Sequence, residues 1–197
     1  VRYNRERDKD SHTAKRKEEY FMGKGAKLLE MVRNAVRKRI PFEYLLVDSW
    51  FTCTELVDFV CRRHRKFHLL GMAKMGNTKY TTASWGDLGA KAIISRLKAK
   101  KDVKYSRRYH CRYAEIKVML GKHSVKLFFC KRGRNEPWKV LLTTDMKLGF
   151  IRAYEIYSMR WSVEVFFSDG KRVLGLADCQ ARDFSAQVAH VSLVMIR

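Results

Sequence analysis

Four side chains in the C-terminal third of the chain have types and a spacing that could act on a phosphate. They follow the pattern Y-x2-R-x3-E-x6-K as Tyr157, Arg160, Glu164 and Lys171. On one continuous helix they fall within a stripe of about 60°. A carboxylate between two cations suits metal-assisted chemistry, because the carboxylate can bind a divalent cation while the cations hold a phosphate backbone. A solvated row of charges at i, i+4 and i, i+7 spacing explains the same pattern equally well.

Apolar residues occupy the arc of this helix beside the polar stripe, and we expect that arc to be the buried face. We therefore expect the polar stripe to line a cleft. The apolar arc consists of Ile156, Met159, Val163, Phe166, Phe167 and Leu174.

Asp48 is the second candidate for metal-assisted chemistry. It directly follows PFEYLLV, a short apolar run typical of a strand that is buried on both faces. Catalytic groups collect at the carboxyl ends of strands in α/β folds, but an Asp in this place is also a common helix N-cap. With Glu164, Asp48 would offer oxygen ligands to Mg²⁺ or Mn²⁺, and a two-metal site would need at least one further carboxylate.

The elements that must position these residues follow an α/β pattern. Apolar residues at helical spacing predict helices over residues 13–39, 150–174 and from Phe184 onward. Thr52-Cys-Thr-Glu55 has the capping-box pattern that begins a helix. Between residues 67 and 143 the pattern changes to a series of strands with one helix around Asp87–Lys98. The predicted strands are KFHLLGMAK, NTKYTTASW, YAEIKVML, SVKLFFCKR and WKVLLTT.

The charge of the chain favours a polyanionic partner. Its 197 residues include 42 Lys and Arg against 20 Asp and Glu, a formal net charge of +22. Residues 91–134 hold 15 Lys and Arg against two acids, a net charge of +13 that favours nucleic acid over an anionic membrane surface. The aromatic residues interleaved with these cations are expected to face the core rather than to stack on bases. They are Tyr105, Tyr109, Tyr113, Phe128 and Phe129.

Several other classes of protein are excluded or disfavoured. No run of about 18 apolar residues exists, so no membrane span is predicted. The five cysteines are scattered and form no CxxC pair, which disfavours a zinc ribbon or a disulfide framework and favours a reduced, cytoplasmic setting.

The spaced Tyr157, Arg160, Glu164 and Lys171 resemble the YREK signature of bacterial insertion-sequence DDE transposases of the IS-four type. LLVDSWF, WKVLLTTD, YSMRWSVEVFFSDGKRVLGL and the later Gln180-Ala-Arg182 resemble segments of that family in the same order. The resemblance implies an α/β, RNase H-like catalytic core, a mixed sheet with flanking helices, interrupted by a β-rich insertion. The expected division is 1–66 for the first part of the core, 67–143 for the basic insertion and 144–197 for the C-terminal helices.

The resemblance also implies roles. Asp48 corresponds to the second catalytic Asp and Glu164 to the catalytic Glu, and both would bind Mg²⁺ or Mn²⁺. Tyr157, Arg160 and Lys171 match residues that contact transposon-end DNA near the scissile phosphate. The implied activity is cleavage of double-stranded DNA at transposon ends, followed by attack of the freed 3′-OH on target DNA. A homodimer in the synaptic complex and a nucleoid-associated, cytoplasmic protein are expected.

Two departures from the family pattern shape these expectations. Asp8 and Asp10 lie only about 40 residues before Asp48, in a charged stretch unlike the strand that carries the family's first Asp. We therefore expect a fragment that lacks the N-terminal part and is inactive alone. The apolar helical pattern that runs from Phe184 to Arg197 without a Gly or Pro stop signal indicates that the other end is cut as well. Trp138 lies one residue out of register with the family's base-stacking tryptophan, so core packing is expected for it. A non-catalytic DNA-binding remnant and a metal-dependent nuclease without strand transfer are the alternative functions.

Overall fold

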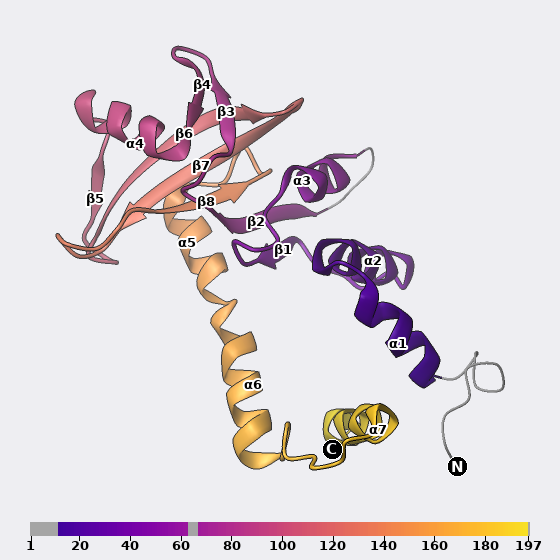
Figure 1. The fold of residues 1–197 in the computed structure, drawn as a ribbon. Helices are drawn as coiled ribbons and strands as arrows, with labels where there is room; N and C mark the ends of the chain where they lie inside the picture. The colour runs from indigo at the N-terminus through magenta and orange to yellow at the C-terminus, as the bar shows by residue number, and fades with distance from the viewer. Residues whose placement is uncertain (1–11, 63–66, 197) are drawn as a thin grey trace. The chain divides into compact units, whose positions relative to one another are not determined.

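The computed structural model describes residues 12–62 and 67–196 (Figure 1). Asp8 and Asp10 therefore lie outside the described residues. The chain divides into two compact units, each described here by itself. One unit is Val32–Ser158, and the other is Val1–Met31 together with Met159–Arg197.

The described strands of the unit Val32–Ser158 form one eight-stranded mixed sheet, in the order β1-β2-β8-β7-β6-β3-β4, with β5 paired to β6 (Figure 1). β1 and β2 pair in parallel, and the other pairs are antiparallel. The strands are β1 (Tyr44–Val47), β2 (His68–Ala73), β3 (Lys79–Thr82), β4 (Gly86–Gly89), β5 (Lys104–Ser106), β6 (Cys111–Leu120), β7 (His123–Lys131) and β8 (Lys139–Thr143).

Each strand predicted between residues 67 and 143 is confirmed, as β2, β3, β6, β7 and β8. The predicted helix is α4 (Ala90–Ala99), which begins later than Asp87. Residues Gly86–Gly89 pair with β3 instead, where Thr81 Oγ1 donates to Asp87 Oδ1 at 2.5 Å. The β-branched and aromatic composition of this region therefore identified most of the sheet.

The strand predicted before Asp48 is confirmed as β1, but its burial on both faces is wrong. Only Val47 of the four residues is buried, and Tyr44–Leu46 are half-buried. The reason is that β1 pairs with β2 on one side and is the edge strand of the described sheet.

The helix predicted after Asp48 is α3 (Thr54–Cys61), but the predicted capping box is wrong. The N-cap residue is Cys53, which makes no side-chain cap bond. Thr52 Oγ1 instead donates to the backbone carbonyl of Asp48 at 3.3 Å, so the threonine closes the turn after β1. Burial of Leu56, Val57, Phe59 and Val60 holds α3 against β2 and β7.

Helix α5 (Phe150–Ser158) packs on the sheet through its apolar side chains Phe150, Ala153 and Ile156. Phe150 stacks on Tyr113 with ring centroids 4.2 Å apart and an interplanar angle of 8°. The core beneath this helix is completed by Leu70, Cys111, Phe128, Cys130, Leu141 and Leu148.

The predicted long helices are each divided in two. A turn at Met159–Arg160 separates α5 from α6 (Trp161–Val173), because Ser162 N–H and Val163 N–H bond to carbonyls three residues back. The helix predicted over residues 13–39 is α1 (His12–Phe21) and α2 (Lys24–Arg37), which are interrupted at Gly23. The last predicted helix is confirmed as α7 (Phe184–Ile196).

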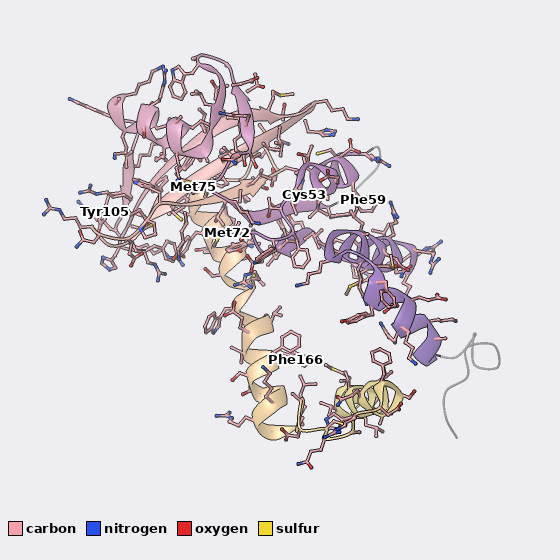
Figure 2. The ribbon with its side chains drawn as sticks, viewed as in Figure 1. Cys53, Phe59, Met72, Met75, Tyr105 and Phe166 are labelled. Atoms are coloured by element: carbon pink, nitrogen blue, oxygen red, sulfur yellow. The ribbon has the colours of Figure 1, made fainter. Side chains whose placement is uncertain are left out.

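The prediction that the apolar arc of the helix with the Y-x2-R-x3-E-x6-K pattern is buried is wrong for most of its residues. Ile156, on α5, is buried, but Met159, Val163, Phe166 and Phe167 are between 47% and 66% exposed. Figure 2 shows Phe166 projecting from α6. In this unit α7 packs against α1, and the apolar face of α6 stays accessible. No described helix combines the length and the apolar character needed to span a bilayer.

Gly71 of β2 allows the turn after β1 to lie close over the sheet. A Cβ at this position would come within 2.5 Å of Thr52 Oγ1 and 2.6 Å of Val47 Cγ2. Val47 and Gly71 are direct partners in the parallel β1–β2 pair, so any side chain at residue 71 would push on both the strand and the turn.

We predict that Gly71→Ala lowers the free energy of unfolding by about 1–3 kcal/mol, the usual effect of overpacking a tight site. Gly149→Ala is the matched control, because a Cβ there meets no described atom within 4 Å. Urea unfolding monitored by circular dichroism measures both. A Gly71→Ala protein as stable as the Gly149→Ala protein would contradict the close-approach argument.

Asp58 ties α3 to the turn between β6 and β7. Its Oδ1 accepts from His123 Nε2 at 2.9 Å and lies 3.1 Å from Lys122 Nζ, while Oδ2 pairs with Arg62 at 2.8 Å. Hydrogen bonds from His123, then Arg62 and Lys122, hold the pKa of the Asp58 carboxyl well below its usual range. Its contribution to stability is therefore present above about pH 4, the ordinary Asp value, and is lost as the pH falls toward the lowered pKa.

We predict that Asp58→Asn lowers the Tm at pH 7 and that the difference from the parent protein narrows below about pH 4. Asp102→Asn is the control, since Asp102 is exposed and makes no side-chain ion pair within the described ranges. Thermal unfolding followed between about pH 3 and pH 7 measures the effect. An Asp58→Asn difference that does not depend on pH would show that the carboxylate charge is not what stabilises this contact.

Candidate functional site

Asp48 lies at the carboxyl end of β1 and begins a turn that reaches Thr52. Its carbonyl accepts hydrogen bonds from Phe51 N at 3.0 Å and Thr52 Oγ1 at 3.3 Å. Its side-chain Oδ1 accepts a hydrogen bond from the backbone N–H of Ser49. Because α3 begins at Thr54 with Cys53 as its N-cap, Asp48 is not the cap of that helix. The N-cap alternative is therefore wrong, and the half-buried carboxylate stands at the strand end.

Tyr157 is the second residue at this strand end. It lies on α5, one residue beyond the buried Ile156, and its Oη donates to the backbone carbonyl of Val47 at 3.3 Å. The bond joins residues 110 positions apart in the chain. The packing of α5 on the sheet thus brings the first residue of the Y-x2-R-x3-E-x6-K pattern to the residue directly before Asp48.

Arg160, Glu164 and Lys171 belong to α6 and the residue that precedes it. Arg160 is the N-cap residue of α6, and its guanidinium pairs with Glu164 Oε1 at 2.5 Å. The Glu164 side chain is 42% exposed. Lys171 is seven residues after Glu164, about two turns along the same face, and is exposed.

The five predicted residues therefore form two groups that belong to different units. Asp48 follows the last residue of β1, Val47, to which Tyr157 bonds, whereas Arg160 pairs with Glu164 on α6. Within the described ranges, no three His, Cys, Asp or Glu side chains gather closely enough to hold a metal ion. The pairing of Arg160 with Glu164 is the i, i+4 ion pair expected of a solvated row of charges on a helix. The same pairing also orients the Glu164 carboxylate.

The donor atoms at the end of β1 suit a hard divalent cation. Asp48 offers carboxylate oxygens, the ligands that Mg²⁺ and Mn²⁺ prefer. Asp48 uses Oδ1 for the Ser49 N–H, and no described residue donates to its Oδ2. One carboxylate oxygen at the strand end is thus available to a ligand.

The basic region 91–134 keeps its charge at the surface and most of its aromatic rings inside. Of its 15 Lys and Arg, only Lys126 and Lys131 are half-buried, and the others are exposed. Phe128 and Phe129 are fully buried, and Tyr109 and Tyr113 pack against the core, as expected. Tyr105 differs, since it is 58% exposed on β5 (Figure 2). Trp138 is half-buried and precedes β8.

A pocket that the sequence analysis missed adjoins Asp48. It begins at Ser49 and includes Trp50, whose ring lies 4.3 Å from Lys74 Nζ. The available signal was a tryptophan in a polar turn, two residues after a candidate catalytic carboxylate.

Comparison with known proteins agrees with this geometry. Residues 22–196 match the model of a family described as the transposase DDE domain. A comparison with curated proteins gives no match. Proteins of this family act on DNA and generally use divalent metal ions. The mostly antiparallel mixed sheet with flanking helices agrees with an RNase H-like domain. The chain therefore belongs to the transposase DDE domain family.

Proposed function

We propose that this chain is the catalytic part of an insertion-sequence transposase of the IS-four type. It cleaves DNA at transposon ends and joins the freed 3′-OH to target DNA. The observation that carries the proposal is the hydrogen bond from Tyr157 to the carbonyl of Val47, which joins the first residue of the YREK pattern to the strand that ends in Asp48. A solvated row of charges would not require this contact.

Asp48 and Glu164 are the proposed catalytic carboxylates and would hold Mg²⁺ or Mn²⁺ through their oxygens. A bound divalent cation supplies Lewis-acid stabilisation of the charge that develops on the attacked phosphate. The chain's own contribution is positional. The Ser49 N–H orients one oxygen of Asp48, and the Arg160 guanidinium orients one oxygen of Glu164.

Tyr157, Arg160 and Lys171 are the proposed contacts to transposon-end DNA near the scissile phosphate. Lys171 is exposed on the same face of α6 as Glu164, so both could meet one strand. The exposed cations of the insertion, residues 67–143, would hold the DNA flanking the cleavage site. Residues 1–66 and 144–197 would form the two parts of the catalytic core, and two copies of the protein would hold the two ends.

One observation favours the alternative of a non-catalytic DNA-binding remnant. The described residues hold no cluster of three metal-ligating side chains, whereas a two-metal site needs at least one carboxylate beyond Asp48 and Glu164. A remnant would bind DNA through the same cations without cutting it. A metal-dependent nuclease would cut DNA without joining the product to a target.

We predict that Asp48→Asn and Glu164→Gln each lower the rate of Mg²⁺-dependent end cleavage by about 10²-fold or more. The affinity for DNA should stay nearly unchanged. Either change removes a carboxylate charge but keeps the shape of the side chain. The test uses the complete polypeptide that contains this sequence, a labelled DNA end and a supercoiled target. Cleavage and joining are read on gels and binding by fluorescence anisotropy.

Asp169→Asn is the control for Glu164→Gln, because Asp169 is an exposed acid on a different face of α6 and pairs with Arg172. Cleavage that survives in both the Asp48 and Glu164 variants would refute the catalytic assignment. Binding without cleavage in the parent protein would favour the remnant, and cleavage without joining would favour the nuclease.

We predict that Lys171→Ala weakens DNA binding and makes the slope of log K against log salt shallower by about 0.9, the value for one phosphate contact on duplex DNA. Arg172→Ala is the matched control. Arg172 is the next exposed cation on α6, points to another face and is paired with Asp169 at 3.1 Å. Equal salt slopes for the parent protein and Lys171→Ala would exclude a phosphate contact by Lys171.

A further inference from the structure

Helix α4 presents a basic face to solvent. Its apolar residues Ala90, Ile93, Ile94 and Leu97 are buried. The sequence from Ala90 to Lys101 contains no acidic residue, and its five cations are all exposed. These five cations form the α4 surface: Lys91, Arg96, Lys98, Lys100 and Lys101.

Lys101 occupies a position where glycine is the usual residue. Its φ is 59°, in the left-handed region that strains a residue with a Cβ. Asp102 N donates to the Leu97 carbonyl at 3.0 Å and Lys101 N to the Lys98 carbonyl at 3.1 Å, the helix-ending motif that favours glycine at this place. The helix dipole is already served by cations within the last turn, such as Lys98. A lysine with a strained backbone therefore indicates a use for its charge.

Trp85 holds two cations of the α4 surface in place. The centroid of its ring lies 6.0 Å from Arg96 Cζ and 5.0 Å from Lys100 Nζ, within the range of cation–π contacts. Trp85 is itself fixed in the turn between β3 and β4, where its backbone N–H donates to Thr82 Oγ1 at 3.0 Å. Side chains that are ordered in advance lose less conformational entropy on binding, so Arg96 and Lys100 are prepared for an anionic partner.

The α4 surface and α5 lie on opposite sides of the sheet. Tyr113 stacks on Phe150 of α5, so the alternation of side chains along β6 places Lys117 on the side of α5 as well. Lys117 is exposed, and among the described residues no helix covers that part of the sheet. On the other side Ala114 and Val118 are buried. Because the apolar face of α4 is buried too, α4 covers the sheet on this other side.

Asp48 and α4 also lie at opposite edges of the sheet. Asp48 follows β1, the strand at one edge, and α4 follows β4, the strand at the other edge (Figure 1). Six strand spacings separate the two edges, roughly 29 Å. A straight duplex with a phosphate at Asp48 and Tyr157 lies on the side of α5, so its phosphates do not meet the α4 surface.

We infer that the α4 surface binds a second DNA duplex, the target to which the freed 3′-OH is joined. This inference rests on the proposed function, which places the first duplex at Asp48 and Tyr157. It separates the cations of α4 from those of the insertion that would hold the DNA at the cleavage site. Contacts from cations to phosphates bind a duplex without reading its bases, which suits a target of variable sequence.

The dimensions and composition of α4 suit a duplex. Its 10 residues span about 15 Å, which corresponds to about four phosphates on each strand. The exposed residues between the cations are Ala92, Ser95 and Ala99, whose short side chains let a phosphate backbone approach. A helix that lies on a membrane instead presents large apolar residues to the lipid, and those of α4 are buried in the protein.

The test uses the complete polypeptide that contains this sequence, loaded with its transposon-end duplex in buffer without divalent metal. A labelled duplex of unrelated sequence is then added, and its binding is measured by fluorescence anisotropy over a range of salt concentrations. The parent protein should bind this second duplex while the end duplex stays bound. Phosphatidylserine vesicles should not displace the second duplex.

Lys101→Gly should make the salt slope for the second duplex shallower by about 0.9, the value for one phosphate contact. It should not lower the Tm, because glycine suits the φ of this position. Arg96→Gln combined with Lys100→Gln should make the slope shallower by about 1.8, the value for two contacts. Both variants should weaken binding of the second duplex more than binding of the end duplex.

Arg37→Gln combined with Lys38→Gln is the matched control. It removes two exposed cations at the end of α2, within the unit Val32–Ser158 that contains α4. The salt slope for the second duplex should stay at the parent's value. In buffer with Mg²⁺ and a supercoiled target, Lys101→Gly should lower the yield of joined product more than the rate of end cleavage, and the control should lower neither.

Equal salt slopes for the parent and both α4 variants would overturn the inference. So would displacement of the second duplex by the end duplex, or equal weakening of both duplexes, since each would show a single path for DNA. Displacement by vesicles that Lys101→Gly abolishes would identify a membrane surface instead. Binding of the second duplex needs no cleavage, so a parent that captures it on α4 but neither cuts nor joins DNA would refute the proposed function alone.

Discussion

The hydrogen bond between Tyr157 and the carbonyl of Val47 is the contact on which the candidate site depends. It exists because α5 buries Phe150, Ala153 and Ile156 on the sheet, which leaves the next residue, Tyr157, facing the end of β1. A shift of α5 by one turn along its axis would carry the Tyr157 hydroxyl about 5 Å from its place and would break the bond to the Val47 carbonyl. The apolar packing of one short helix therefore decides which polar residues can act together.

The turn from Asp48 to Thr52 presents a carboxylate, on Asp48, and an exposed indole, on Trp50, within three residues. Its carboxylate stays at the strand end, held by the Ser49 N–H, while Trp50 is exposed and lines the pocket. The turn can lie this close to β2 because Gly71 has no side chain to displace Thr52. A glycine on β2, the strand beside the edge strand β1, thus shapes the surface on which the carboxylate and the indole are displayed.

The charge of the protein is organised by the sheet that carries it. In β6 and β7 successive side chains point to opposite faces, so the neighbours Phe128 and Phe129 are buried on the two faces of the sheet. The cations stay exposed at other positions of this hairpin, Arg112, Lys117 and Lys122. Lys126 is an exception among these cations, because it is half-buried and its contacts are structural. It pairs with Glu115 at 3.1 Å and donates to the carbonyl of Leu148 just before α5 begins. The transposase DDE domain family acts on DNA, and the exposed cations are the groups proposed to meet its phosphates.

The sequence by itself determined the α/β class, nearly all of the sheet, the basic surface and the strand that ends in Asp48. These features depend on local composition and period, which neighbouring residues are sufficient to express. Tertiary structure decided which features meet. Thr52 bonds to Asp48 instead of capping α3, a turn at Met159–Arg160 divides the predicted helix, and the apolar face of α6 stays exposed. The approach of Tyr157 to Val47 and of Lys74 to Trp50 joins residues far apart in the chain. Such contacts follow from packing, which no local pattern encodes.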